Sequence, residues 1–377
     1  MDLKTRQAVI RQLAKAYRQA SKKVRGQMLD QVVQTTGYHR WRAAWLLTHP
    51  PKLASKKQVR RRGSKYTPVL PELRKLWSIS NFACGKRLVG MLPEYVECLT
   101  RDGEMVIPEI SRKLLLEMSA ATIDRILKGE RKLVWGKGRT TTKPGTLLKH
   151  QIPIQIFTRW DERKPGFIEM DLVAHCGPTA KGEFAYTLDC TDLDLCWDEC
   201  RAVLGRGQGR VLSALQTIRN RMPMSLLGID SDNDEVFINE HLYRWCQTEH
   251  ITFTRSREYR KNDQAHVEEK NWSVVRKYIG YRRLDTQHQV DILNELYDVL
   301  RLYYNFFQAN MKLERKQRDG GRVKRIYGPV KTPYARVLDH PDIPSPAKDQ
   351  LRQKYHTLNP AALLRAILKI TDQLTAG

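Results

Sequence analysis

Acidic side chains and long apolar runs are scarce in this sequence of 377 residues. Its 41 Asp and Glu are outnumbered by 66 Lys and Arg, which gives a formal net charge of +25 at pH 7. Apolar runs all fall short of the ~20 residues that a membrane-spanning helix needs, and the first residues lack the apolar segment of a secretory signal. We therefore expect neither a membrane protein nor a secreted protein. The excess of positive charge predicts a polyanionic partner.

The sequence also lacks two common kinds of site. Its seven cysteines are odd in number and include no CxxC pair, so we expect reduced thiols rather than a disulfide framework or a zinc site. The phosphate-binding pattern GxxxxGK[ST] is absent, so ATP use is not indicated. A hydrophobic share of 41% over this length is enough for roughly two to three domains with substantial cores.

Charge is distributed unevenly along the chain. Residues 1–70 contain 17 basic and 2 acidic side chains, whereas residues 151–290 contain 19 basic and 21 acidic ones. An excess of this size is larger than a solvated surface requires, so we expect the basic ends of the chain to bind phosphates. The carboxylates concentrated in the middle would repel DNA unless cations lie between them.

Residues 1–50 are expected to form a helix-turn-helix DNA-binding domain. Apolar residues recur at helical spacing in 3–20 and 23–35, and a third helix is predicted from 38 to 50. Gly37 interrupts the pattern between the last two helices, which is typical of the short turn in this motif.

The start of the third helix is the expected recognition surface. His39, Arg40 and Arg42 lie on its first turns, where a recognition helix contacts base edges. Trp41 and Trp45 are one helical turn apart, and we expect them in the core of the domain rather than on its surface.

A basic linker is predicted at 51–68. It has almost no large apolar side chain and so cannot form a core. We expect Arg60, Arg61 and Arg62 to lie along DNA, with a minor-groove path as one option. A free, solvated linker is the alternative.

A second helical domain, also of helix-turn-helix type, is predicted at 69–130. Ser119 is expected to cap the second helix of the pair. Such helical pairs also occur in proteins that bind no DNA. Residues 131–155, rich in Gly, Thr and basic side chains, predict a second basic linker in which Lys137 and Arg139 are candidate DNA contacts.

A mixed α/β core is predicted at 156–310. Its expected elements are strands at 166–174, 183–192 and 196–203, a helix at 208–222, a strand at 225–230, a helix at 237–249, a strand at 251–254 and a helix at 264–279. Ligands of open α/β sheets bind beyond the strand ends, so polar residues at these ends are candidates for the site.

Three carboxylates fit a metal-dependent reaction on phosphodiesters. Asp171 lies in the first predicted strand, Asp232 follows the fourth, and Glu268 lies one turn into the last helix. Two divalent ions ~3.5–4 Å apart activate the attacking oxygen and stabilise the leaving one. Mg²⁺ prefers hard oxygen ligands such as carboxylates. The three residues are therefore candidate catalytic residues and metal ligands.

The sequences around these carboxylates form three motifs with a defined spacing. They read Phe167-Ile168-Glu169-Met170-Asp171, Ser231-Asp232-Asn233 and Val267-Glu268-Glu269-Lys270-Asn271. The second and third carboxylates are separated by 35 residues. Motifs and spacing resemble those of bacterial insertion-sequence DDE transposases of the retroviral-integrase type, over roughly residues 150–310. A further segment, Tyr304-Asn305 with Gln308, Asn310 and Leu313, is also similar to these proteins.

The resemblance implies an RNase H-like core with Asp171, Asp232 and Glu268 holding two Mg²⁺ ions, for which Mn²⁺ substitutes. Asn233 and Asn271 are the supporting residues of the matched motifs. The family pattern decides between candidate residues in two cases. Asp230 lies on the same face as Asp232 if the strand continues, because the side-chain period is 2, and the pattern selects Asp232. Glu269 adjoins Glu268, and the pattern selects Glu268.

The sequence departs from the family pattern at two positions. Asp234 stands where the family has Gly after the Asp-Asn pair, and Val236 stands where it has Glu. Asp tolerates positive φ better than most residues, but it adds negative charge beside the site.

The remaining basic segments are further candidates for DNA contact. Arg255, Arg257, Arg260 and Lys261 follow the last strand of the core and are expected to hold DNA near the site. Residues 311–377 form a basic C-terminal module, with a small β unit expected at 322–338 and helices at 347–375. The last helix is apolar and is a candidate for a dimer contact.

The chain is thus predicted to be a multidomain α+β protein with N-terminal helix-turn-helix domains, an RNase H-like mixed α/β core and a basic C-terminal module. The family resemblance implies a transposase that binds terminal inverted repeats, nicks 3′ ends and joins them to target DNA. Its expected partners are DNA and at least one further copy of the chain, and its expected location is the bacterial cytoplasm, with the nucleoid. A non-catalytic regulator descended from a transposase and a metal-dependent nuclease of the same fold are the alternatives.

Overall fold

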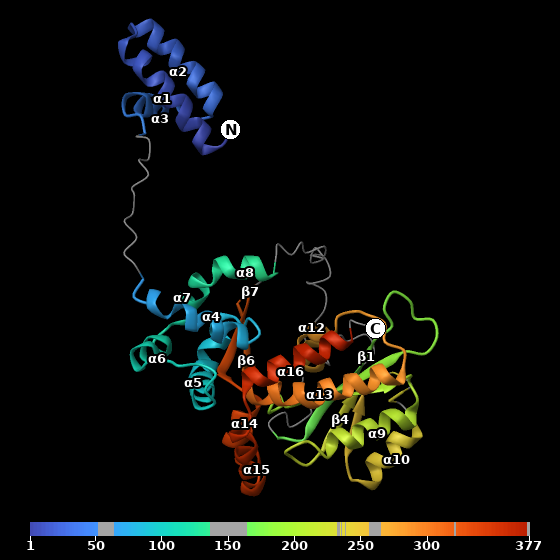
Figure 1. Ribbon diagram of the computed structural model, residues 1–377. Helices are drawn as coiled ribbons and strands as arrows, with labels where there is room; N and C mark the ends of the chain where they lie inside the picture. Colours follow the sequence, from blue (N-terminus) through green and yellow to red (C-terminus); the bar gives the residue numbers. More distant parts are fainter. Residues whose placement is uncertain are drawn as a thin grey trace. The chain divides into compact units, whose positions relative to one another are not determined.

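The structure is a computed structural model that describes most of the chain (Figure 1). The described residues are 1–51, 64–135, 164–231, 234, 236–237, 239–255, 265–319 and 322–374. They form two compact units, Met1–Ser64 and Lys65–Gly377.

Several predicted site residues lie outside the described residues. They are Arg60, Arg61, Arg62, Lys137, Arg139, Asp232, Asn233, Arg257, Arg260 and Lys261. For Arg255 and Glu268 the structure describes the backbone but not the side chain.

The first unit consists of the three helices expected from the sequence. These are α1 (Leu3–Gln19), α2 (Lys22–Thr36) and α3 (Arg40–Thr48). Gly37 ends α2 with φ of 70°, a left-handed conformation that Gly adopts without strain. Ile10, Val32 and Leu47 form the centre of a small apolar core.

The expectation that Trp41 and Trp45 belong to this core is wrong. They are 72% and 50% exposed, respectively. The buried residues of α3 are Ala43 and Leu47. Two residues correspond to ~200° of rotation on an α-helix, so the indole rings lie on the side of α3 opposite its core face.

The second unit is built on a five-stranded mixed sheet. Its strands are β1 (Phe167–Ala174), β2 (Ala185–Asp192), β3 (Asp198–Leu204), β4 (Gly228–Ser231) and β5 (Thr252–Arg255). The order is β3-β2-β1-β4-β5: the first three strands form an antiparallel meander, and β4 and β5 run parallel to β1. The predicted mixed α/β core is thereby confirmed.

Alternation along β1 assigns each face of the sheet to a different layer of helices (Figure 1). Ile168 and Met170 are fully buried in the apolar cluster that includes α9 (Gln208–Arg219) and α10 (Glu240–Thr248). Val173 points to the other face and packs in a cluster with α13 (Gln287–Phe307). The two acidic residues of β1 therefore face this second layer.

Helices that precede the core in the sequence and helices that follow it share one apolar cluster with the core. They are α4 (Leu70–Ile79), α5 (Gly85–Arg101), α6 (Glu109–Leu116), α7 (Ala120–Ile126), α14 (Pro333–Asp339) and α15 (Ser345–His356). Trp77, Tyr95, Phe307 and Tyr334 belong to this cluster. α8 (Lys128–Trp135) follows α7, and Ser119 caps α7 as expected, with its side chain accepting from Thr122 N at 3.3 Å.

The C-terminal segment contains a ribbon and a docked helix. β6 (Asn310–Asp319) pairs with β7 (Arg322–Lys331), and α16 (Pro360–Gln373) follows α15. Ile367 and Ile370 of α16 are buried against α13, so its apolar face is already covered within the chain. No helix among the described residues is long and apolar enough to cross a membrane.

Candidate active site

Asp171 links the central strand to the helix that carries the third motif. It is the fifth residue of β1 and is partly exposed. Its Oδ2 accepts a hydrogen bond from Asn271 Nδ2 at 2.6 Å, and its Oδ1 accepts from Leu172 N at 2.8 Å. Residues of the first and third motifs, 100 positions apart, are therefore in direct contact.

Glu169 makes a second connection between these elements. It lies two residues before Asp171 and so on the same face of β1, and it is 3% exposed. Its Oε2 accepts from Val267 N at 3.0 Å. Val267 is in the first turn of α11 (Ala265–Lys270), where backbone N–H groups lack partners within the helix and the helix dipole favours an anion.

Glu169 was not among the residues predicted to belong to the site. Its alternation with Asp171 was visible in the first motif and was the signal that could have identified it. Its contact fixes the start of α11 against β1.

The third motif spans a change of helix type. α11 passes directly into a π-helical segment, Asn271–Arg276, and then α12 (Lys277–Ile279). Position 268 lies three residues before Asn271, and residues three apart on a helix are surface neighbours. Glu269, the alternative to Glu268, is exposed. The π-helical geometry was not predicted.

The second motif begins where β4 ends. Ser231, the last residue of β4, is the Cα partner of Met170, which directly precedes Asp171. Asp230, the alternative to Asp232, is a Cα partner of Glu169, and its Oδ1 accepts from Thr254 Oγ1 at 2.6 Å. The Asp230 carboxylate is thus hydrogen-bonded to β5.

The contacts of Asp234 explain how its negative charge is accommodated. It forms an ion pair with Arg206 and accepts a hydrogen bond from Val236 N at 3.1 Å. The arginine offsets the negative charge of Asp234, which stands where the sequences that this motif resembles have Gly.

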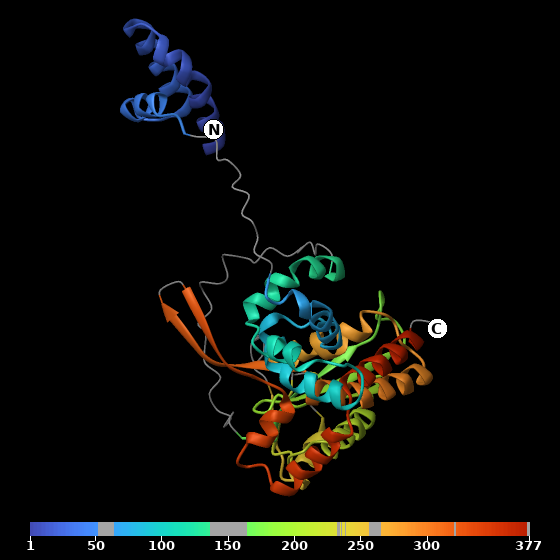
Figure 2. The same cartoon turned by 60° about the vertical axis from the view of Figure 1, so that its left-hand side comes forward.

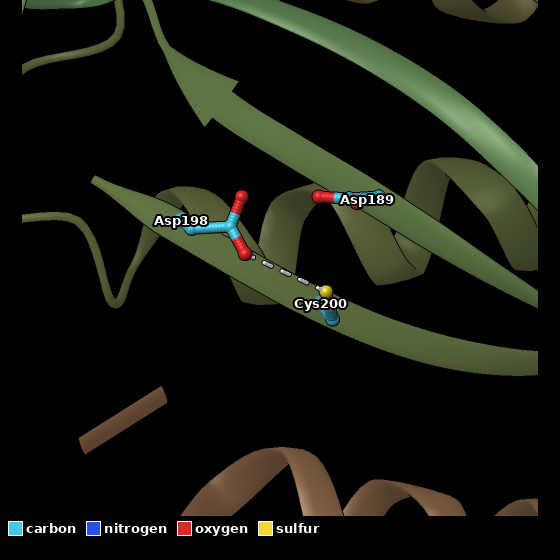
Figure 3. A group of neighbouring side chains, drawn as sticks. All are labelled: Asp189, Asp198 and Cys200. Carbon is cyan, nitrogen blue, oxygen red and sulfur yellow. Dashed lines mark hydrogen bonds between the residues drawn. The ribbon is translucent and has the colours of Figure 1, made fainter. Parts of the chain in front are cut away.

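A buried acidic cluster lies beside Asp171 on the neighbouring strands. Asp189 is the Cα partner of Asp171, and it groups with Asp198 and Cys200, all at most 5% exposed (Figure 3). The ligand atoms of the three residues lie within 4.8 Å of one another. Asp198 accepts from Thr191 Oγ1 at 2.6 Å, and its other oxygen is 4.0 Å from Cys200 Sγ.

Burial and a nearby lysine determine the electrostatics of this cluster. Burial, followed by the charge of Asp198, raises the pKa of Asp189 well above its ordinary value. Lys270 is 4% exposed. Burial alone lowers the pKa of Lys270, but Tyr304, Cys196 and Asp198 outweigh it and raise the pKa above its ordinary value.

The Lys270 ammonium interacts electrostatically with Asp198 of this cluster. Lys270 also donates to Tyr304 OH at 2.6 Å. A second cation among these groups would be repelled by the ammonium. Burial of Lys270 was not predicted, because a lysine beside two glutamates on a helix has the pattern of a solvated surface.

The Tyr304-Asn305 segment holds α13 against this network. The Asn305 side chain accepts from Asp198 N at 3.0 Å and donates to Asp198 O at 2.8 Å. Gln308 donates to Tyr95 OH at 3.2 Å. These residues bind backbone and buried side chains, so their role here is structural.

His175 is a buried neutral residue that couples stability to pH. It is 0% exposed, and its Nε2 lies 2.8 Å from Thr187 Oγ1. Burial, aided by the positive charge of Arg276, lowers the pKa of His175 to about 3. In the unfolded chain His175 is protonated below about pH 6.5, whereas in the folded chain it stays neutral. The free energy of unfolding therefore decreases as the pH falls below ~6.5.

We expect His175→Gln to flatten this acid-side loss. Relative to the variant, the wild type should lose about 2 kcal/mol of unfolding free energy between pH 7 and pH 5. Urea denaturation at both pH values measures this difference. Parallel changes in the two proteins would show that His175 is protonated in the folded state.

In the first unit, the predicted DNA contacts are all exposed. His39 precedes α3 as its N-cap residue. Arg40 forms an ion pair with Asp30, and the guanidinium of Arg42 lies 5.8 Å from the centre of the Tyr38 ring. The three side chains are accessible to a ligand.

Solved structures similar to this chain include retroviral integrases. The catalytic core domain of BIV integrase is 15% identical, with a TM-score of 0.31 over 50% of this chain and 98% of that one. A simian T-cell lymphotropic virus intasome in complex with PP2A regulatory subunit B56 gamma is 14% identical, with a TM-score of 0.37 over 65% of this chain and 75% of that one. The HTLV-2 integrase catalytic core domain in complex with magnesium is 15% identical, with a TM-score of 0.29 over 39% and 90%.

Sequence comparison gives a closer relationship. No family model matches the chain. The protein designated "Uncharacterized protein y4rM" from Sinorhizobium fredii is 37% identical over 337 residues, which cover 89% of this chain and 96% of that protein. Identity at this level over nearly the whole of both chains shows common descent, and the chain belongs to the same protein family as y4rM of Sinorhizobium fredii.

Proposed function

We propose that this protein is a DDE-type polynucleotidyl transferase that acts as a DNA transposase. The observation that carries the proposal is the hydrogen bond between Asn271 and Asp171, because it joins the first and third motifs in space. The pairing of Ser231 with Met170 adds the second motif, since Asp232 follows Ser231 by one peptide bond. Three separate segments thus converge at one place on the sheet, as a shared site requires.

The residues present fit a divalent metal. Asp171 supplies carboxylate oxygens at a partly exposed position, and Asp232 and Glu268 would add two more carboxylates. Asn271 Oδ1 is buried and has no hydrogen-bond partner among the described residues, which suits a donor such as a water ligand of a hydrated ion. Two Mg²⁺ ions, with Mn²⁺ as a substitute, would activate the attacking oxygen and stabilise the leaving one.

The chain's own residues position this site. Glu169 holds the start of α11, and Asn271 orients the Asp171 carboxylate. Lys270, buried at the end of α11, donates to Tyr304 OH at 2.6 Å and so joins α11 to α13. Such supporting contacts keep ligands within the narrow geometry that catalysis requires.

The reaction proposed is nicking of 3′ ends by water, followed by joining of those ends to target DNA. The terminal inverted repeats of the element would be bound by the first unit through His39, Arg40 and Arg42. The linker residues Arg60–Arg62, Lys137 and Arg139 would bind the DNA backbone, as would the loop residues Arg255, Arg257, Arg260 and Lys261. Because two DNA ends must be brought together, the active form would be at least a dimer. Its location would be the bacterial cytoplasm.

A strand-transfer assay tests this function. Duplex oligonucleotides copied from inverted repeats that flank the gene are incubated with the full chain, with Mg²⁺ and with chelator. We expect joined products only with metal, and Glu268→Gln should abolish nicking and joining while leaving DNA binding intact. Glu269→Gln, the same change at the exposed neighbouring position, is the matched control and should remain active.

Other outcomes separate the alternatives. Cut products without joined products would identify a metal-dependent nuclease. Binding of the repeats without any cleavage would identify a regulator. Full joining activity in Glu268→Gln or in Asp232→Asn would contradict the assignment of the site.

A further inference from the structure

The β6–β7 ribbon is a sheet separate from the catalytic core. Among the described residues its two strands pair only with each other, whereas β1–β5 form one sheet. The ribbon projects from the body of the second unit (Figure 2). Two-stranded ribbons are marginally stable in water, so this one needs support from the rest of the unit.

That support is confined to the base of the ribbon. Arg336 Nη2 donates to Asn310 Oδ1 at 2.8 Å, and Lys312 forms an ion pair with Asp194. Val330 packs so closely on α5 that a Cβ added to Gly90 would lie 2.6 Å from its Cγ1. The first residues of β6 and the last residues of β7 are therefore fixed to the body.

The outer part of the ribbon is solvated on both faces. Arg318 is the Cα partner of Val323, and Gln317 that of Lys324, so these adjacent pairs lie on opposite faces. All four side chains are exposed, and Val323 is 45% exposed. No layer of the described structure covers either face, which leaves both available to a ligand.

Charge in this outer part has one dominant sign. Residues 315–326 contain six basic side chains and one acidic side chain. Arg315, Lys324 and Arg325 form no ion pair with any described residue. These three exposed charges are therefore available to a polyanion.

We propose that this ribbon enters the major groove of duplex DNA. The major groove of B-DNA is wide enough to admit a two-stranded β-ribbon. The anchored base sets its direction, Arg315, Lys324 and Arg325 contact phosphates at the groove walls, and Val323 offers an apolar contact to a thymine methyl group. The inference rests on the proposed function in one respect, that the ligand of the protein is DNA.

Salt-dependent binding of the full chain tests the ribbon without any catalytic step. Binding of a fluorescent DNA duplex is measured in chelator, as a function of salt, for wild type and Lys324→Gln/Arg325→Gln. Loss of two phosphate contacts should lower the slope of log K against log salt by about 1.8 and weaken binding about tenfold near physiological salt. The control is Lys354→Gln/Lys369→Gln, which removes two exposed charges from α15 and α16 and should leave the slope unchanged.

A second probe distinguishes groove insertion from general charge attraction. The deep, narrow major groove of A-form RNA does not admit the ribbon. The ribbon variant should therefore bind DNA about tenfold more weakly than wild type, whereas its affinity for an RNA duplex of the same sequence should fall much less. Equal losses on both duplexes would overturn the groove assignment.

Failure of the ribbon proposal is distinguishable from failure of the proposed function. If wild type binds DNA and the ribbon variant matches it in slope and affinity, only the ribbon proposal is wrong. If wild type binds no DNA, both are wrong. Equal melting temperatures of wild type and variant verify that the substitutions at these exposed positions leave the fold intact.

Discussion

Asp171→Asn is expected to lower the rates of DNA nicking and joining by roughly three orders of magnitude, while DNA affinity in chelator stays within about twofold. Loss of one anionic ligand weakens metal binding and removes charge stabilisation worth several kcal/mol in the transition state. The substitution keeps the size of the side chain. Its amide oxygen can still accept from Leu172 N, and its NH2 group can donate to Asn271 Oδ1 once the Asn271 amide turns over, because that oxygen has no other partner among the described residues. Single-turnover rates over a range of Mg²⁺ concentrations measure the effect.

Asn271→Ala provides the graded comparison. It removes the side chain that orients Asp171 but leaves all three carboxylates, so the loss should be about 10–100-fold and partly recovered by high Mg²⁺. An Asp171→Asn variant with near-normal joining would show that the hydrogen-bonded pair is a structural contact and that the reaction centre lies elsewhere.

Arg301→Met is expected to destabilise the second unit by about 3–5 kcal/mol. Arg301 Nε and Nη2 each donate to Glu199 at 2.6 Å, and the Glu199 side chain is 1% exposed. Removing the guanidinium leaves a buried carboxylate whose remaining donor is Trp197 Nε1 at 2.9 Å. An uncompensated buried charge carries a penalty of this size. Urea denaturation followed by tryptophan fluorescence measures the loss.

Two controls separate charge burial from the loss of arginine itself. Arg365→Met breaks an exposed pair with Glu104 and should cost at most about 1 kcal/mol. The double variant Glu199→Gln/Arg301→Met removes the stranded charge and should recover part of the stability. A loss as small as that of Arg365→Met would show that water reaches Glu199 in the folded protein.

The sequence predicted most secondary structure because each element has a strong local pattern. The three helices of the first unit, the meander of β1–β3 and the helices after β3, β4 and β5 follow from periodicity and end signals. Periodicity does not say which stripe of a short helix is covered, and this is why Trp41 and Trp45 were misplaced. α3 is nine residues long and carries apolar side chains around most of its circumference.

The sequence by itself determined the candidate chemistry: the basic ends, the three carboxylates, their order and the 35-residue interval. These properties are local or depend on counting along the chain. Only the tertiary structure decided that Asn271 contacts Asp171, that Glu169 anchors α11 and that Lys270 is buried beside Asp198. The physical reason is that burial and hydrogen bonding between segments 70–100 residues apart depend on how strands register and helices dock. A glutamate or lysine in a sequence has the pattern of surface charge until packing removes it from water.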